Sequence, residues 1–322
     1  MPVGKRRTVK LLVVFSIFMA TISTLSPISA HQPTVSSAKY AHKQYLPVMF
    51  GSTISAAETG NHDLINQLRA KASVPPVRYN TTLEENCLEH ARYMAENGII
   101  THKQNPNNPY YSRKGQSCAR QSNVWLGNGA PASAWQTNDA IMDWMASVPH
   151  RAWLLYPTSK AFGYGFYWSE ASKHAGAAID ILSAADFAAD DAYDAWPFRY
   201  PGSGQKGIPA TRYPITLNWR YFGPEPVLSQ VRLTTADGTA IAHKATIQTA
   251  AGHKGIQIIP KQELPVQSRI RVSVKGHYEG TPFSYSWHFR TGDKQFTAGT
   301  TETATGNRSA KAGPDLCLSM LP

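Results

Sequence analysis

The spacing of the apolar residues changes part-way along this chain of 322 residues. Between about residues 60 and 150, apolar side chains recur three or four positions apart, as they do along one face of a helix. From about residue 213 they fall into short runs separated by turns, and in IRVSV they alternate with polar residues. The change predicts an α+β protein: a layered helix-and-sheet domain over 57–187, followed by an all-β, immunoglobulin-like sandwich over 213–292.

The stretch TTLEENCLEHARYMAENG is the clearest helix in the chain. Thr82 with Glu85 fits a capping box at its start, and Gly98 stands where a left-handed C-terminal cap is wanted. Its apolar face consists of Leu83, Cys87, Ala91 and Met94. A shorter helix is predicted before it in DLINQLRAKAS, with Asn61 or Asp63 as its cap.

Residues 100–133 are rich in Asn, Pro, Gly and Ser and are predicted to form one long loop. Loops of this length without secondary structure are uncommon in compact domains and usually carry function. A third helix is predicted to begin near Asp139 and to be interrupted at Pro149. Two strands are then predicted in AFGYGFYW and HAGAAIDIL.

The second half contains five or more short β-like runs. Pro and Gly punctuate residues 188–212, which are predicted to be a linker before these runs. Asp237-Gly238 lies between two runs and predicts a hairpin turn. The Thr-, Ala- and Gly-rich tail, residues 293–322, is predicted to be disordered.

The N-terminus has the pattern of a secretory signal peptide over residues 1–30. A cationic segment precedes the apolar run LLVVFSIFMATIS, which is shorter than the roughly 20 residues that span a bilayer, and cleavage is expected after Ala30. A membrane anchor is the alternative. Residues 31–56 are predicted to be an N-terminal extension, and no later stretch is apolar enough to span a membrane. The mature protein is expected to be extracellular.

The formal net charge of +11 includes four basic residues of the predicted signal peptide, which leaves +7. The remaining Lys and Arg form no dense run interleaved with aromatic residues, so a nucleic-acid partner is not expected. Association with anionic walls or lipid headgroups is compatible with this charge.

Three cysteines in an exported chain suggest one disulfide and one further thiol. Cys87 with Cys118 is the preferred pair, since both lie in the first predicted domain. Cys317 would then be free or pair between chains. The alternative for Cys87 is a small buried apolar side chain.

The first domain resembles the CAP superfamily, which comprises cysteine-rich secretory proteins, antigen 5 and plant pathogenesis-related proteins of class 1. The first matching stretch contains Asn66, Arg69, the VPP turn with Tyr79, Leu83, Ala91 and His102. The second is WMASVPHRAWLLYP followed by FGYG, which is similar to the bacterial form of a family signature. The resemblance covers roughly residues 59–185, and the β-rich half resembles an extension found on some bacterial members.

The resemblance implies an α-β-α sandwich with a cavity lined by two histidines and usually two acidic residues. His102 and His150 match the histidines, whereas Ser122, which precedes Asn123, and Ser147 stand at the acidic positions. These five residues are the predicted ligand-binding set. Zinc at His102 and His150 is a further hypothesis, although two histidines alone make a poor zinc site.

Each histidine also has a purely structural interpretation. His102 would bind backbone carbonyls at a helix exit. His150 would be a histidine at the C-terminal end of a helix, favoured by the dipole and packed between Trp144 and Trp153.

Three function classes follow from these residues. We expect a non-enzymatic binding module, and the resemblance implies a lipid or sterol ligand for some members. A secreted hydrolase is the second class, with Ser122, Ser147 or Cys118 as nucleophile and Asp143 as an orienting acid, although no Gly-x-Ser-x-Gly elbow is present. The third is a structural surface protein whose β domain contacts a cell wall or another partner.

Overall fold

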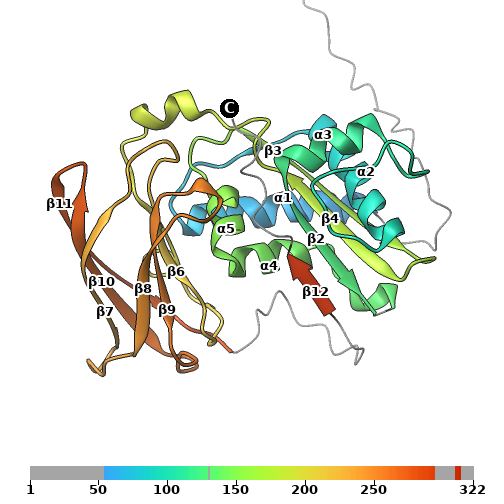
Figure 1. The fold of residues 1–322 in the computed structure, drawn as a ribbon. Coiled ribbons are helices and arrows are strands. Elements are labelled where there is room, and N and C mark those ends of the chain that lie inside the picture. Colours follow the sequence, from blue (N-terminus) through green and yellow to red (C-terminus); the bar gives the residue numbers. More distant parts are fainter. Residues whose placement is uncertain (1–53, 130, 294–308, 313–322) are drawn as a thin grey trace, which may run out of the picture. The chain divides into compact units, whose positions relative to one another are not determined.

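A computed structural model describes residues 54–129, 131–293 and 309–312 (Figure 1). The predicted signal peptide, most of the predicted extension 31–56 and Cys317 lie outside these residues. The chain is α+β, as predicted, with five α-helices and three β-sheets in the described ranges.

The first two helices show how the local sequence sets the helix ends. Helix α1 spans Ile54–Lys71, so it begins earlier than predicted, and both predicted caps, Asn61 and Asp63, lie inside it. Helix α2 spans Thr81–Asn97. Its N-cap is Asn80, whose side chain accepts a hydrogen bond from the Leu83 amide, so the predicted capping box at Thr82 is wrong. Gly98 is the C-cap at φ 60°, as predicted.

Residues 100–133 are not one long loop. Helix α3 (Arg113–Gln121) and strand β2 (Ser122–Asn128) occupy much of this stretch, followed by a single 3-10 turn, Ala132–Ala134. The side chain of Ser112 caps α3 by accepting a hydrogen bond from the Gly115 amide. The prediction failed because the helix contains a glycine and few apolar residues.

Helices α4 (Asp139–Ala146) and α5 (Val148–Leu154) meet at Ser147, which ends one and begins the next. Pro149 lies in the first turn of α5, where a missing amide proton costs nothing. The interruption predicted at Pro149 is therefore a junction between two short helices.

The first sheet has the strand order β1-β3-β4-β2-β12. Its predicted central strands are β3 (Ala161–Ser169) and β4 (His174–Asp180), which pair antiparallel, and β1 (Arg78–Tyr79) runs parallel to β3. Strand β12 (Ser309–Ala312) pairs with β2, so the expectation of a wholly disordered tail is wrong at these four residues.

Helices cover both faces of this sheet (Figure 1). On one face, Ala178 packs with Cys87, Met94, Cys118 and Val124, which brings α2 and α3 against the strands. The other face packs on α1, α4 and α5 through a larger apolar cluster. A Cβ atom at Gly163 or Gly165 would overlap the α2 backbone, so these two glycines let the helix lie directly on β3.

The second half forms two antiparallel sheets that resemble a sandwich. The three-stranded sheet, in the order β11-β10-β7, contains β7 (Val227–Thr235), β10 (Arg269–Tyr278) and β11 (Thr281–Arg290). The four-stranded sheet, in the order β5-β6-β9-β8, contains β5 (Phe198–Tyr200), β6 (Ile215–Asn218), β8 (His243–Gln248) and β9 (Gly255–Pro260).

Two local features connect this half to the sequence patterns. Strand β5 and the 3-10 helix Phe187–Ala192 lie within or beside the predicted linker 188–212. Asp237-Gly238 does form the predicted hairpin turn: the Thr235 amide donates to the Thr239 carbonyl and the Ile241 amide donates to the Leu233 carbonyl, on either side of the antiparallel bridge Thr234–Ala240. The pairing is short, because strands β7 and β8 then enter different sheets.

Helix α5 contacts the second half through buried polar and aromatic groups. Arg151 donates a hydrogen bond to the Pro214 carbonyl and lies over the ring of Tyr213. The hydroxyl of Tyr213 donates to the Met145 carbonyl at 2.8 Å, and the Tyr221 amide donates to the hydroxyl of Tyr156 at 3.0 Å. The first-domain residues nearest to His150 are therefore packed against the second half.

Candidate functional site

Hydrogen bonds link three of the five predicted ligand-binding residues, Asn123, His150 and Ser147, while His102 contacts the end of α3 and Ser122 begins β2. His102 lies after α2 and is half-buried. Its Nδ1 is 3.1 Å from the carbonyl oxygen of Ala119, near the end of α3, and donates the hydrogen bond. The structural interpretation of His102, a ring that binds a backbone carbonyl, is therefore seen, and it fixes the ring beside this junction.

His150 lies in the first turn of α5, so its predicted place at the C-terminal end of a helix is wrong. Its Nδ1 is 2.7 Å from the hydroxyl of Ser147, the N-cap residue three positions earlier. The Asn123 side chain donates to the backbone carbonyl of His150 at 3.0 Å. Ser147 makes no side-chain capping bond to a backbone amide of α5, so its contact with His150 joins two side chains.

Strand β2 begins with two fully buried polar residues, Ser122 and Asn123. Ser122 lies opposite Asp180 in the β2–β4 register. Asp180 is a buried acid that sequence reasoning missed, and its carboxylate accepts hydrogen bonds from the Ser183 amide and hydroxyl. Burial raises the pKa of this carboxyl group despite those hydrogen bonds. It supports the turn after β4 and adds an acid next to the predicted site.

His90 is a second group that is absent from the predicted set. It is fully buried on α2, with Nε2 2.8 Å from the Thr101 carbonyl and Nδ1 3.1 Å from the amide nitrogen of Gln104. A neutral ring that donates from Nε2 and accepts at Nδ1 satisfies both contacts. Burial, together with a smaller contribution from the neighbouring His102, lowers the pKa of His90 to about 4. His90 therefore holds the segment that carries His102.

A third buried histidine, His253, reaches α5 from the second half. Its ring lies 4.3 Å from that of Trp153 and 5.6 Å from that of Tyr221, measured between centroids. Burial lowers the pKa of His253 to about 3, with a further contribution from His150 and then Lys254. The contact of His253 with Trp153 brings the second half against α5, the helix that carries His150.

The donor set does not fit zinc. Over the described ranges, no three His, Cys, Asp or Glu side chains are arranged to hold a metal ion. Tetrahedral zinc needs three or four such ligands, and Nδ1 of His150 is already engaged with Ser147. We therefore derive no chemistry through a metal here.

Two pockets in the described part of the chain lie away from the five predicted residues. One, of about 470 Å³, lies between the VPP turn and residues 157–160 and 189–193. The other, of about 330 Å³, lies in the second half and includes Lys206 and Arg290. Of the five predicted residues, Ser122, Asn123 and His150 are buried, and His102 and Ser147 are partly exposed.

The cysteine prediction is confirmed. Cys87 on α2 and Cys118 on α3 form a disulfide, and both residues are fully buried. The bond fixes α3 against α2 immediately before Ala119, whose carbonyl holds His102. Because Cys118 is in the disulfide, it offers no free thiolate for the hydrolase hypothesis.

Comparison with known families matches residues 62–179 to the cysteine-rich secretory protein family, CAP. Residues 62–179 form a CAP domain. Within this CAP domain, Asn66 and Arg69 hydrogen-bond to the backbone of Val77 and Pro75, which explains physically why these residues accompany the VPP turn.

A comparison with curated proteins found no match for the chain. Solved structures that match it include an outer surface protein from Borrelia burgdorferi. The sequence identity is 18%, the match covers 40% of this chain and 94% of that one, and the TM-score is 0.30. We build no inference on a likeness at this score.

The buried histidines make the fold sensitive to acid. An unfolded histidine has a pKa near 6.5, whereas the folded values are about 4 for His90 and about 3 for His253. As the pH falls below 6.5, the unfolded chain takes up protons that the folded chain does not. The contribution of the two neutral histidines to the free energy of unfolding is therefore complete above pH 6.5, and it is lost as the pH falls toward their folded pKa values. For His90 the loss is on the order of 3 kcal/mol.

Replacing His253 with Phe isolates one of these groups. Nε2 of His253 has no hydrogen-bond partner among the described residues, so we expect the free energy of unfolding at pH 7 to stay within about 1 kcal/mol of wild type. The loss between pH 7 and pH 4 should become smaller. Urea unfolding at each pH measures both quantities, with exposed His277→Gln as the control. An unchanged pH slope in His253→Phe would contradict the assignment.

Proposed function

We propose that this chain is a secreted, non-enzymatic binding protein whose CAP domain takes a small apolar ligand with one polar group. The observation that carries the proposal is the contact set at the α3–β2 junction. His102 contacts Ala119, Asn123 contacts His150, and His150 contacts Ser147, so residues from three separate segments meet there. A few fixed polar groups within an apolar surrounding are typical of small-molecule sites.

The surroundings of the junction favour an apolar ligand. Val124, Trp144 and Met145 are fully buried next to the polar residues, and the Trp144 indole donates to the Val124 carbonyl. The polar group of a ligand would be recognised by the half-buried ring of His102. Because Val124, Trp144 and Met145 are fully buried, an apolar ligand would contact them only after a local displacement of the segment that carries His102.

Binding is favoured over hydrolysis by the roles that the polar side chains already have. Ser147 lies 2.7 Å from Nδ1 of His150, but the acid that the hydrolase hypothesis requires is engaged elsewhere. The Asp143 carboxylate accepts a hydrogen bond from the Trp125 indole at 2.7 Å. Burial raises the pKa of the Asp143 carboxyl group, and the bond to Trp125 opposes that rise. Reactivity of Ser147 with a fluorophosphonate probe, lost in Ser147→Ala, would overturn the non-enzymatic assignment.

The proposed location and organisation follow from the remaining sequence features. Residues 1–30 would direct export, and the seven strands of the second half would form an immunoglobulin-like domain. In the part of the chain that the structure describes, no helix is long and apolar enough to cross a membrane.

Lipid capture tests the proposal. The full chain is incubated with a total lipid extract and, separately, with cholesterol, and bound ligand is detected by native mass spectrometry. We expect retained ligand in wild type and at least a fivefold lower bound fraction in His102→Ala. His277→Ala, which changes an exposed histidine in the second half, serves as the control.

Two outcomes would contradict the proposal. The first is no captured lipid with a folded protein, and the second is equal capture by His102→Ala and wild type. Elemental analysis of the same samples addresses zinc. Stoichiometric zinc that disappears in His102→Ala would show that the site holds a metal instead.

A further inference from the structure

The outer face of the three-stranded sheet carries a cluster of positive charges. Along β10, the buried residues Ile270, Val272 and Val274 alternate with exposed residues on the opposite side. The exposed basic residues on this side of the sheet are Arg232, Arg269, Arg271, Lys275 and Arg290, and we call them the cationic face. Cross-strand partners in an antiparallel pair share one side of the sheet, so the register brings all five onto the same side.

The register places these charges close together. Arg269 is paired directly with Arg290, and Arg232 is paired with Ser273, between Arg271 and Lys275 on β10. Directly paired residues are about 5 Å apart, and residues two apart on one strand are about 7 Å apart. Like charges opposite each other destabilise a sheet. The arrangement therefore costs stability in the absence of a bound anion.

No acidic residue of the protein neutralises the cationic face among the described residues. Strands β7, β10 and β11 contain no Asp or Glu. The acids at the ends of these strands have other contacts: Asp237 bonds to Thr239, Glu279 pairs with Arg220, and Asp293 accepts from Gln267. Some exposed cations elsewhere do have an acidic partner, for example Lys114 with Glu85 and Lys160 with Asp186.

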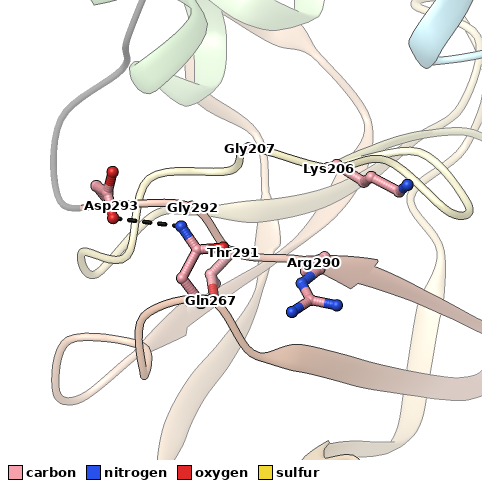
Figure 2. A pocket seen from close by; sticks show the side chains of 7 residues that line it. All are labelled: Lys206, Gly207, Gln267, Arg290, Thr291, Gly292 and Asp293. Carbon is pink, nitrogen blue, oxygen red and sulfur yellow. Dashed lines mark hydrogen bonds between the residues drawn. The ribbon is translucent and has the colours of Figure 1, made fainter.

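A pocket of about 330 Å³ continues the cationic face at the end of β11 (Figure 2). Its lining includes Arg290 and Lys206. The Arg290 amide donates to the Gln205 carbonyl at 2.7 Å, which holds the segment with Lys206 beside β11. Figure 2 shows Asp293 turned toward Gln267, at the other end of the pocket from Lys206. Lys206 thus adds a sixth basic residue beside the cationic face.

We propose that the cationic face and this pocket bind a linear anionic polysaccharide. Arginine forks recognise sulfate, phosphate and carboxylate groups bidentately, and the row from Arg269 to Lys275 is about 20 Å long, enough for several sugar residues. Ser273, Ser284, Ser286 and Gln230 lie between the cations and can bond to sugar hydroxyls. This surface is distinct from the α3–β2 junction and does not depend on the function proposed for it.

The side chains on this face argue against other polyanions. Aromatic platforms that stack bases are needed for single-stranded nucleic acid, and the exposed positions of the three strands carry none. Insertion into a bilayer needs exposed apolar residues, and the positions between the cations are polar. Charge complementarity without stacking or insertion fits an extended, hydrated anionic polymer.

The test uses the full chain with heparin as the probe, in fluorescence titrations at 50 and 200 mM NaCl. The variant Arg269→Gln/Arg271→Gln/Arg290→Gln removes three charges at exposed positions. The control Lys71→Gln/Arg113→Gln/Arg120→Gln removes three exposed charges from the first domain. We expect the variant to weaken heparin binding at least tenfold and to reduce its salt dependence, and the control to change it less than twofold.

Three results would overturn the proposal: no heparin binding by wild type, an equal loss in the control, or an equal affinity for uncharged dextran. Double-stranded DNA and vesicles containing phosphatidylglycerol are titrated in parallel. Tighter binding of either one, lost in the Arg269/Arg271/Arg290 variant, would reassign the face to that polyanion. Thermal melts of both variants confirm that each is folded.

Discussion

Replacing Arg69 with methionine is expected to lower the free energy of unfolding by about 3–5 kcal/mol, because three carbonyl groups, two of them in buried hydrogen bonds, lose their donor together. Arg69 is fully buried on α1. It donates to the carbonyls of Pro75 at 2.8 Å, Leu154 at 2.7 Å and Tyr156 at 3.0 Å. Its guanidinium also lies over the ring of Phe162. One side chain thus ties α1 to the VPP turn and to the end of α5.

Methionine keeps much of the apolar stem of the arginine and removes the guanidinium group. The decrease in the free energy of unfolding therefore measures the contribution of the guanidinium hydrogen bonds. Arg69→Lys should fall between wild type and Arg69→Met, since an ammonium group cannot reach all three carbonyls in the planar geometry of arginine. Lys71→Met, two residues later and exposed, is the control. Urea unfolding provides the measurement, and a change below about 1 kcal/mol in Arg69→Met would contradict this role.

Removing the disulfide is expected to cost about 2–4 kcal/mol. The bond closes a loop between Cys87 and Cys118, which are separated by 31 positions, and its loss frees the unfolded chain. The double variant Cys87→Ala/Cys118→Ala also removes two buried sulfur atoms from the cluster with Met94 and Val124. Wild type in reducing agent should show a similar loss of stability.

The disulfide prediction has a local readout as well. Hydrogen exchange at α3 and at the start of β2 should accelerate in the double variant, while exchange in β10 should stay unchanged. A Cys317→Ser background removes the third thiol from these measurements. If reducing agent leaves the unfolding midpoint of wild type unchanged, the bond does not contribute as described.

The sequence-based predictions succeeded where a short pattern is sufficient by itself. The left-handed residue after α2 needs a glycine, and Gly98 is there. Strands β3, β4 and β10 follow runs whose length and alternation are visible in the sequence. The resemblance to the family signature also identified His102 and His150. His102 contacts Ala119 at the end of α3, and His150 contacts Asn123 at the start of β2.

The predictions failed where distant segments determine the structure. Helix α3 contains Gly115, a poor helix former, because a Cβ atom there would overlap the side chain of Gln104. Asp180 lies opposite Ser122 and His253 contacts Trp153, although both are far along the chain from these partners. No local sequence pattern predicts either position. His90 was predictable: it lies three residues after Cys87 and four before Met94, on the buried face of α2.

The contacts of α5 mean that the change of sequence pattern near residue 190 does not divide the protein into separable modules. Trp153 and Tyr156 belong to the same apolar cluster as Leu217 and Ile256 of the second half. Strand β12, which follows the second half in the chain, completes the sheet of the first. A chain cut at the predicted linker would leave an uncovered tryptophan on one piece and an unpaired strand edge on the sheet. Grafting the second half onto another protein therefore requires the surface of α5 to be transferred with it. Grafting the first half requires a replacement for the residues that cover Trp153.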